Sequence, residues 1–382
     1  MRKTICLGDM ATYINGYAFK PADWGTKGLP IIRIQNLTDS GKDYNYYEGE
    51  VKEKYLVRKG DVLISWSASI GVYEWEKEDA WLNQHIFKVV FDKGEVDKRY
   101  FKYATGYVLE KSLQYAHGST MKHLTKGAFD KLPIPIYDLK EQRVIAEKIG
   151  KVDEAIFECE AMLADFELLV KSRFVEMFGS PITNDKNLPI ASLGSCLQGI
   201  ENGKSFVCDS NSRTGKQPGV LKLSAATYGI YKPEENKAIL SADDFVEQAE
   251  VHAGDLLFTR KNTPELVGMS AYVWQTPEKL MMPDLIFRLI PNQQMHPIFL
   301  WKLINHDVFR CKIQELATGT AKSMSNISKE RLRNLEIIVP PIKLQNQFAD
   351  FVVQTDKSKL TIQKSMDNLQ ELRDSLLQEY FG

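Results

Sequence analysis

The sequence predicts a mixed α/β (α+β) protein of two similar halves, with two long antiparallel helices that form an intramolecular coiled coil. Two observations support this fold class: residues 139–179 and 342–382 share a long-helix pattern, and short segments of the first domain recur in order in the second. Repeats at a fixed period indicate duplicated structural units. We therefore expect a pseudo-twofold repeat of a mixed domain and a helix, with the domains at 1–138 and 180–341.

The first long helix has a narrow apolar seam. Its apolar residues are separated by alternating steps of four and three, which is the spacing of a heptad repeat. Charged residues occupy the other faces, as expected for a helix that exposes most of its surface. Such a seam needs a partner to bury it. The seam consists of Ile145, Ile149, Val152, Ile156, Cys159, Leu163, Phe166 and Val170.

The partner helix lies 203 positions downstream, where Phe178 and Gly179 recur as Phe381 and Gly382, and Gln142 recurs as Gln345. Its seam is weaker, because Thr355, Lys359 and Arg373 occupy apolar positions of the first copy. Thr355 and Lys359 either fix the register of the pair, opposite Val152 or its neighbours, or face another protein. The apolar seam residues of this helix are Phe348, Val352, Ile362, Met366 and Leu369.

The two domains share short anchors in the same order. The segment GDVLIS at 60–65 recurs as GDLLFT at 254–259, and IFKV at 86–89 recurs as IFRL at 286–289. Each Gly-Asp pair predicts a turn into a short buried strand. Helical spacing follows at residues 100–114 and 297–316. We infer that each domain combines strands with at least one helix.

Polar, glycine-containing loops follow these strands and helices at equivalent places in both domains. Arg, Lys, Asn, Gln, Ser and Thr side chains contact base edges and phosphates, although such loops are also common as ordinary solvent-facing connections. Trp66 is the least usual member, and it could equally anchor its loop to the core. The DNA-binding candidates are Arg33, Gln35, Asn36, Ser65, Trp66, Lys122 and His123 in the first domain and Lys222, Arg260, Lys261, Asn262, Lys322 and Ser323 in the second.

Signatures of catalysis and metal binding are missing from the sequence. GIENGKS at 199–205 is one residue short of a phosphate-binding loop and predicts an ordinary turn. The chain has no H-E-x-x-H, no G-x-G-x-x-G and no Asn-Pro-Pro-aromatic tetrapeptide, and its five cysteines are scattered. We therefore predict that the chain is not an enzyme and has neither a metal site nor a cofactor.

Composition and charge limit the class of protein further. No run of about 18 apolar residues predicts a membrane span, and the N-terminus has no signal-peptide core. Unpaired, scattered cysteines fit a reducing cytoplasm. The net charge is −1, so any site for a polyanion must be local rather than a broad basic surface.

The chain resembles the specificity (S) subunits of Type I restriction-modification systems over essentially its full length. The resemblance depends on the twofold repeat, on the run LPIPIYDLKEQRVIAEKIGKVDEAI at 132–156, and on the helix ends EMFG and EYFG. The second copy, PPIKLQNQF, lacks the Glu of the EQ pair in the first.

This resemblance implies a noncatalytic DNA-recognition subunit with two target-recognition domains, each of which would bind one half of a split site on double-stranded DNA. The paired helices would set the spacing and dock two modification (methyltransferase) subunits. S-adenosylmethionine, ATP and Mg would be bound by modification and restriction subunits, and no cofactor by this chain. The complex would be an adenine-specific DNA methyltransferase and ATP-dependent endonuclease that serves phage defence in the cytoplasm.

Helix length adds an expectation about the DNA site. About 36 helical residues span roughly 54 Å, which is long enough to hold two domains one duplex turn, about 34–36 Å, apart. Because the loops of the two domains differ, the half-sites should differ as well. The residues alone leave open a standalone DNA-modifying enzyme with atypical motifs, a protein-binding scaffold, and a specificity subunit of a methylation-only system.

Overall fold

The structure is a computed structural model that describes residues 3–38, 42–66, 69–115, 125–318 and 324–382. The chain forms two compact units, which we call the first unit (Met1–Ala161 with Gln363–Gly382) and the second unit (Met162–Ile362). Each unit contains one mixed domain and one part of each long helix. The predicted fold class, a mixed α/β repeat with two long packed helices, is confirmed.

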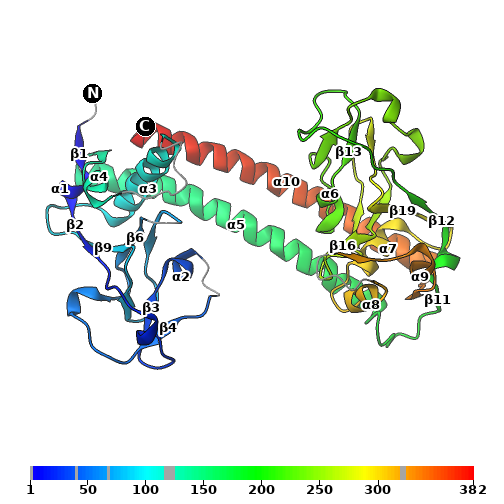
Figure 1. The fold of residues 1–382 in the computed structure, drawn as a ribbon, viewed down its shortest axis with the longest axis horizontal. Coiled ribbons are helices and arrows are strands. Elements are labelled where there is room, and N and C mark those ends of the chain that lie inside the picture. The colour runs from blue at the N-terminus through cyan, green and yellow to red at the C-terminus, as the bar shows by residue number, and fades with distance from the viewer. Residues whose placement is uncertain (1–2, 39–41, 67–68, 116–124, 319–323) are drawn as a thin grey trace. The chain divides into compact units, whose positions relative to one another are not determined.

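The first domain contains two four-stranded sheets (Figure 1). One is antiparallel with the order β2-β9-β6-β7, and the other has the order β4-β3-β8-β5 with a parallel β3–β8 pair. A separate pair joins β1 to β10. The strands are β1 (Thr4–Cys6), β2 (Thr12–Asn15), β3 (Leu29–Ile32), β4 (Asn45–Tyr47), β5 (Leu56–Val57), β6 (Val62–Ser65), β7 (Gly71–Glu74), β8 (Ala80–Leu82), β9 (Ile86–Val90) and β10 (Pro133–Pro135), and the helices are α1 (Leu7–Met10), α2 (Ile34–Thr38), α3 (Lys98–Tyr115) and α4 (Lys126–Asp130).

The second domain repeats this topology, except that its mixed sheet has three strands rather than four. Its antiparallel sheet has the order β12-β19-β15-β17, its mixed sheet β14-β13-β18 contains a parallel β13–β18 pair, and β11 pairs with β21. An additional pair, β16–β20, joins two loops. The strands are β11 (Ile190–Ser192), β12 (Leu197–Asn202), β13 (Gly219–Leu221), β14 (Asn236–Ala238), β15 (Leu256–Thr259), β16 (Lys261–Asn262), β17 (Ser270–Tyr272), β18 (Leu280–Met281), β19 (Ile286–Pro291), β20 (Ser325–Asn326) and β21 (Glu336–Ile338), and the helices are α6 (Ser224–Thr227), α7 (Pro297–Ile304), α8 (Arg310–Glu315) and α9 (Lys329–Arg333).

The helical spacing at 297–316 is divided between α7 and α8 rather than forming one helix. Asn305 ends α7, and its side-chain amide donates to the carbonyl of Ser270 (2.7 Å) and accepts from the Ser270 N–H (3.0 Å). These bonds tie the end of α7 to strand β17, so the chain turns there before α8 begins.

The repeated Gly-Asp pairs form the same turn in both domains. Gly60 and Gly254 have φ values of 85° and 95°, in the left-handed region that glycine enters without a steric penalty. Asp61 accepts from the Arg58 N–H and pairs with Lys88 (both 2.8 Å). Asp255 likewise accepts from the His252 N–H (2.8 Å) and pairs with Arg288 (3.1 Å). The aspartates therefore hold the turn and join β6 to β9, and β15 to β19.

Two buried glutamines fasten the long helices to the domains. Gln142, near the start of α5 (Leu139–Phe178), accepts from the N–H of Asp97, just before α3, and donates to the carbonyl five residues upstream, at Tyr137 (both 2.9 Å). Gln345, near the start of α10 (Ile342–Phe381), accepts from the N–H of His296, just before α7 (2.9 Å), and donates to Pro340, again five residues upstream (2.7 Å). The recurring glutamine is therefore a structural anchor.

The two helices run antiparallel in each unit. In the first unit, Lys148 contacts Tyr380 and Asp153 pairs with Arg373 (2.6 Å). In the second unit, Glu167 pairs with Lys359 (3.1 Å), and Phe174 packs edge-on against Phe348. Partner numbers fall along α10 as they rise along α5. All predicted seam residues are buried or half-buried, whereas most residues between them are exposed.

Thr355 and Lys359, two polar residues of the α10 seam, have their partners inside the second unit. Thr355 is buried, and its hydroxyl donates to the Phe351 carbonyl one turn earlier (2.9 Å). Lys359 faces Glu167, so the expectation that it lies opposite Val152 was wrong. The antiparallel register places the C-terminal part of α5 opposite this segment, which supports the register-fixing alternative over the external one.

Candidate nucleic-acid interface

The polar loops of the second domain lie side by side. Strand β16 pairs with β20 through Lys261 opposite Asn326 and Asn262 opposite Ser325. The loop after β15 therefore meets the loop before α9, although more than fifty residues separate them in sequence. In the first domain the equivalent loops fall largely outside the described residues.

A phenylalanine supports the first loop in each domain. Trp66 stacks on Phe87 with ring centroids 5.7 Å apart and an interplanar angle of 23°, and His85 lies 5.0 Å from it. At the equivalent place, the Arg260 guanidinium lies 5.0 Å above the ring of Phe287. The two domains thus present an indole and a guanidinium on the same support.

Arg260 is held in a fixed orientation. Its Nε and Nη2 atoms both donate to Oδ1 of Asn326, at 3.3 and 3.1 Å. The third guanidinium nitrogen, Nη1, takes no part in the two bonds to Asn326. A guanidinium with its plane fixed by a ring and an amide is well suited to bidentate contacts, because less conformational entropy is lost on binding.

The first-domain candidates differ in their accessibility. Arg33 is half-buried, with its guanidinium 4.9 Å from the ring of exposed Trp24, and Gln35 is half-buried on α2. Asn36 is buried, accepts from the Arg33 N–H (3.1 Å) and donates to the carbonyls of residues 42 and 43. Ser65 is fully buried in β6, and Trp66 packs on the core. Asn36 and Trp66 therefore shape the loops, whereas Arg33 and Gln35 remain partly accessible.

The second-domain candidates include two partly exposed lysines and one buried amide. Lys222 lies 3.7 Å from Glu235, and Lys261 lies 3.9 Å from Asp284; both lysines remain about one third exposed. Asn262 is buried and donates to the Thr227 hydroxyl (3.1 Å), which joins α6 to β16. Lys122, His123, Lys322 and Ser323 lie outside the described residues.

Two basic residues that were not among the sequence candidates, Lys329 and Arg333, also lie in this region. Lys329, the first residue of α9, places its ammonium 5.6 Å from the Phe287 ring and donates to the Ile200 carbonyl (2.6 Å). Desolvation lowers its pKa, and the nearby charges of Arg333 and Arg260 lower it further, while Glu201 acts in the opposite sense. A sequence signal for Lys329 and Arg333 did exist: they are two basic residues four apart, directly after a polar loop.

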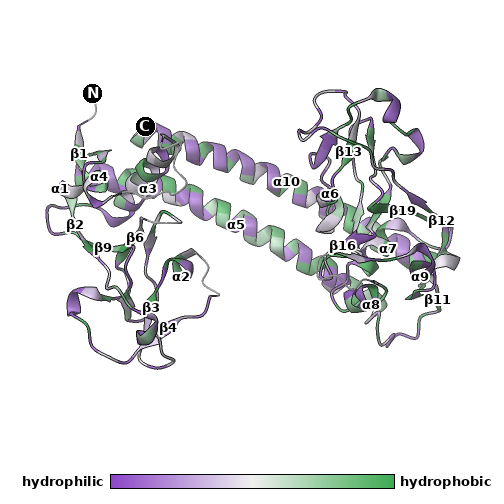
Figure 2. Ribbon diagram, viewed as in Figure 1, coloured by the Kyte–Doolittle hydropathy of each residue, from purple (hydrophilic) through white to green (hydrophobic). Residues whose placement is uncertain are grey.

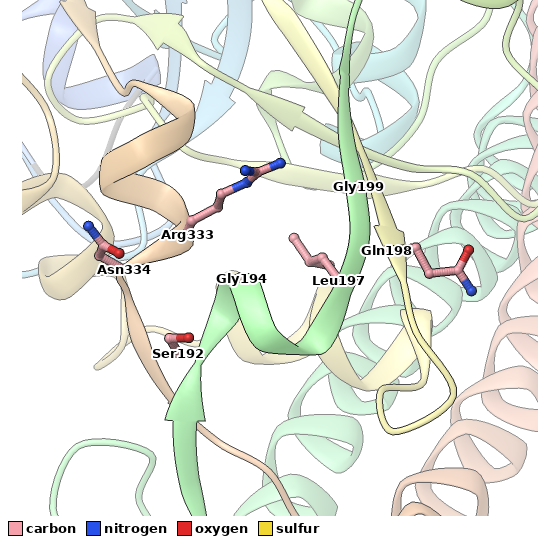
Figure 3. A pocket seen from close by; sticks show the side chains of 7 residues that line it. All are labelled: Ser192, Gly194, Leu197, Gln198, Gly199, Arg333 and Asn334. Carbon is pink, nitrogen blue, oxygen red and sulfur yellow. The ribbon is translucent and has the colours of Figure 1, made fainter.

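A polar hollow of about 370 Å³ lies beside Arg333 in the second domain (Figure 3). Figure 3 shows the Arg333 side chain extending from α9 toward the strand that contains Gly199. Among the residues that the structure describes, no three His, Cys, Asp or Glu side chains are placed to hold a metal ion. The described helices also include none that is long and apolar enough to cross a membrane.

Comparison with known proteins decides the family. The Type I restriction modification DNA specificity domain matches residues 2–163 and 200–372, one match for each half of the repeat. The chain belongs to this family. It is a specificity subunit of a Type I restriction-modification system. The family is noncatalytic, so the alternative of a standalone enzyme does not apply.

Individual relatives agree with this assignment. The chain is 21% identical to the EcoBI specificity subunit of Escherichia coli over 99% of its own length and 85% of that protein. It is 22% identical to the EcoKI specificity subunit of E. coli strain K12 over 69% of this chain and 60% of that one. The fold resembles that of the S subunit from M. genitalium, with a TM-score of 0.59, 14% identity, and coverage of 100% and 96% of the two chains.

Family membership also fixes the biochemical setting of this specificity subunit. Type I complexes methylate and restrict DNA, and they assemble from DNA, modification and restriction subunits. The specificity subunits have no cofactor, because S-adenosylmethionine and ATP are bound by the other subunits. The polar loops and cations described above are therefore candidate DNA contacts of a recognition subunit.

Proposed function

We propose that each mixed domain of this specificity subunit binds one half of an asymmetric bipartite DNA site in the cytoplasm. The observation that supports this most directly is the pair of equivalent positions Trp66 and Arg260. Both lie on the same phenylalanine support in the same topology, yet Trp66 packs on the core, whereas Arg260 is a cation with several hydrogen-bond donors. A repeated framework that presents different residues at equivalent positions should recognise two different half-sites.

The chemistry of the second domain fits recognition through the major groove. A fixed guanidinium can donate two hydrogen bonds to O6 and N7 of guanine, and the Phe287 ring and the Asn326 amide restrict the orientation of the Arg260 guanidinium. Lys222 and Lys261 supply further donors at the surface. Arg33, Gln35 and the loop residues Lys122, His123, Lys322 and Ser323 remain predicted contacts.

Methylation sequencing tests this proposal. Cells that express the complex should methylate adenines in an interrupted motif with two unlike halves, and cells without this subunit should lose that methylation. Arg260→Ala should relax recognition at one half only, by about 1–3 kcal/mol, or roughly 5- to 160-fold, as expected for the loss of one bidentate base contact. A palindromic or continuous motif would contradict the proposal.

We further propose that two modification subunits dock on the exposed faces of the paired helices. Phe157 in the first unit is 71% exposed, and Leu168 and Leu360 in the second unit are 62% and 57% exposed. In Figure 2, residues coloured as hydrophobic are more frequent along α5 than along α10. Large apolar side chains this exposed on helices that are otherwise charged are candidates for a protein interaction surface.

Replacing Leu168 with Glu should weaken association with the modification subunit by at least about 30-fold, because a buried interface anchor is worth about 2 kcal/mol or more. Co-purification and analytical ultracentrifugation of the two proteins without DNA measure this loss. Glu160→Gln on the same helix is the matched control and should leave association unchanged. The thermal unfolding midpoint of the variant should stay at the wild-type value, since Leu168 is already exposed. Full assembly of the Leu168→Glu variant would rule out this surface.

A further inference from the structure

Helices α4 and α9 are equivalent elements with opposite charge at one position. Thr125 and Ser328 cap them in the same way, by accepting from the N–H three residues later. A Cβ on Gly8 would lie 2.9 Å from Cβ of Asp130, and one on Gly194 would lie 3.0 Å from Cβ of Arg333. Because the same glycine contact defines both places, Asp130 and Arg333 occupy the same site in the two domains.

The lysines four residues before these positions, Lys126 and Lys329, differ in the charge beside them. Lys126 pairs with Asp130 at 2.8 Å, so the first-domain helix neutralises its own cation. Lys329 stands four residues before Arg333, on the same face of α9, and therefore lies beside a like charge. Two cations four apart on a helix destabilise it slightly. A bound anion would offset this repulsion, so two adjacent cations favour an anion-binding site.

Arg260 brings a third cation to this cluster. Its guanidinium and the Lys329 ammonium both lie over the Phe287 ring, at 5.0 and 5.6 Å. Glu201 is the acidic group whose charge raises the pKa of Lys329. Glu201 already pairs with Arg288 at 3.2 Å, so much of its charge is balanced elsewhere.

The hollow beside Arg333 can receive an anion. Its lining has one cation and no carboxylate, and two glycines expose backbone there; the lining residues are Ser192, Gly194, Leu197, Gln198, Gly199, Arg333 and Asn334 (Figure 3). Hydroxyl, amide and guanidinium groups are the usual partners of nucleic-acid phosphates.

We propose that Lys329 and Arg333 bind backbone phosphates of the DNA duplex, and that the first domain has no such phosphate site at the equivalent place. This inference rests on the proposed binding of DNA by both domains. The second domain then supplies salt-dependent anchoring, whereas the first domain contributes recognition with less phosphate contact at α4. The subunit would then make more phosphate contacts with one half-site than with the other.

Counterion release makes this proposal measurable. Each phosphate neutralised by a cation contributes about −0.9 to the slope of log K against log salt concentration for B-DNA. Arg333→Gln should therefore reduce the magnitude of the slope by about 0.9, and Lys329→Gln with Arg333→Gln by about 1.8. The methylated motif should not change, because phosphate contacts do not specify bases.

The experiment uses the complex with its modification subunits and a duplex containing its methylated motif, with affinity measured over a series of KCl concentrations. Lys126 is the counterpart of Lys329 in the first domain. Lys126→Gln therefore removes one positive charge from the equivalent place and should leave the slope unchanged. Arg333→Lys should retain the wild-type slope, since a point charge suffices for a phosphate. When Arg333 is replaced with Gln, the complex should lose phosphate-ethylation interference signals in one half-site and keep those in the other.

The outcomes separate this inference from the proposed function. A wild-type slope in the Arg333→Gln complex, or an equal loss in the Lys126→Gln complex, overturns the phosphate assignment while DNA recognition stands. If the wild-type complex shows no preference for its motif over random duplex, the proposed function itself fails.

Discussion

Lengthening both long helices by one heptad should abolish methylation of the natural motif and produce methylation of a motif with the same halves and a longer spacer. Seven residues add about 10.5 Å to a helix at 1.5 Å per residue, which corresponds to about three base pairs at 3.4 Å each. The insertions belong after Ala161 and Ile362, where the first and second units divide. A heptad keeps the apolar seam in phase.

The control for this experiment is a heptad inserted in α5 alone. One helix would then exceed its partner, and the pairs Asp153–Arg373 and Glu167–Lys359 could not both form. That variant should lose methylation of every motif, including those with longer spacers. Adenine-methylation sequencing of both strains measures the outcome. Unchanged methylation of the natural motif by the doubly lengthened protein would show that the helices do not set the spacing.

The long helices could be predicted from sequence because their signal is periodic and local. The seam from Ile145 to Val170 is buried or half-buried at every position, and the glutamine shared by the two copies makes an equivalent pair of bonds in each. The partner of Lys359 could not be predicted in the same way. Which residues face each other depends on the register of two segments nearly two hundred residues apart, and neither segment encodes that register by itself.

The candidate DNA contacts were harder to predict because a side chain's chemistry does not reveal its direction. Asn36 and Asn262 have the amides expected of base-contacting residues, but both are buried and bond to their own domain. Lys329 and Arg333 stand four residues apart on a short helix, a spacing that by itself gave little reason to prefer them to other basic residues. Their significance comes from the approach of α9 to Phe287, which only the tertiary structure brings about.

The repeat sharpened the interpretation of individual residues. Trp66 alone could be a DNA contact or a core anchor, and its stacking on Phe87 indicates an anchor. Comparison with Arg260, which occupies the same support, shows that this position can also present a polar group toward the loops. Equivalent positions in the two domains therefore provide an internal comparison between a shared framework and the residues that differ on it.

Replacing Gln345 with Leu should lower the free energy of unfolding of the second unit by about 3 kcal/mol, because buried polar groups left without partners cost about 1–3 kcal/mol each. Gln345 is fully buried, and its side chain bonds to the N–H of His296 and to the carbonyls of Pro340 and Gln294. Leucine fills a similar volume but makes none of these bonds. The start of α10 would lose its connection to α7, which the adjacent apolar contacts cannot replace.

Urea unfolding followed by circular dichroism measures this loss, and Gln347→Leu is its matched control. Gln347 lies two residues further along α10 and is exposed, so its replacement should change stability by less than about 0.5 kcal/mol. Gln142→Leu tests the same anchor in the first unit, where two bonds are lost instead of three, and about 2 kcal/mol is expected. Equal unfolding midpoints for the Gln345→Leu and Gln347→Leu proteins would mean that the apolar seam, rather than the glutamine, holds α10 to its domain.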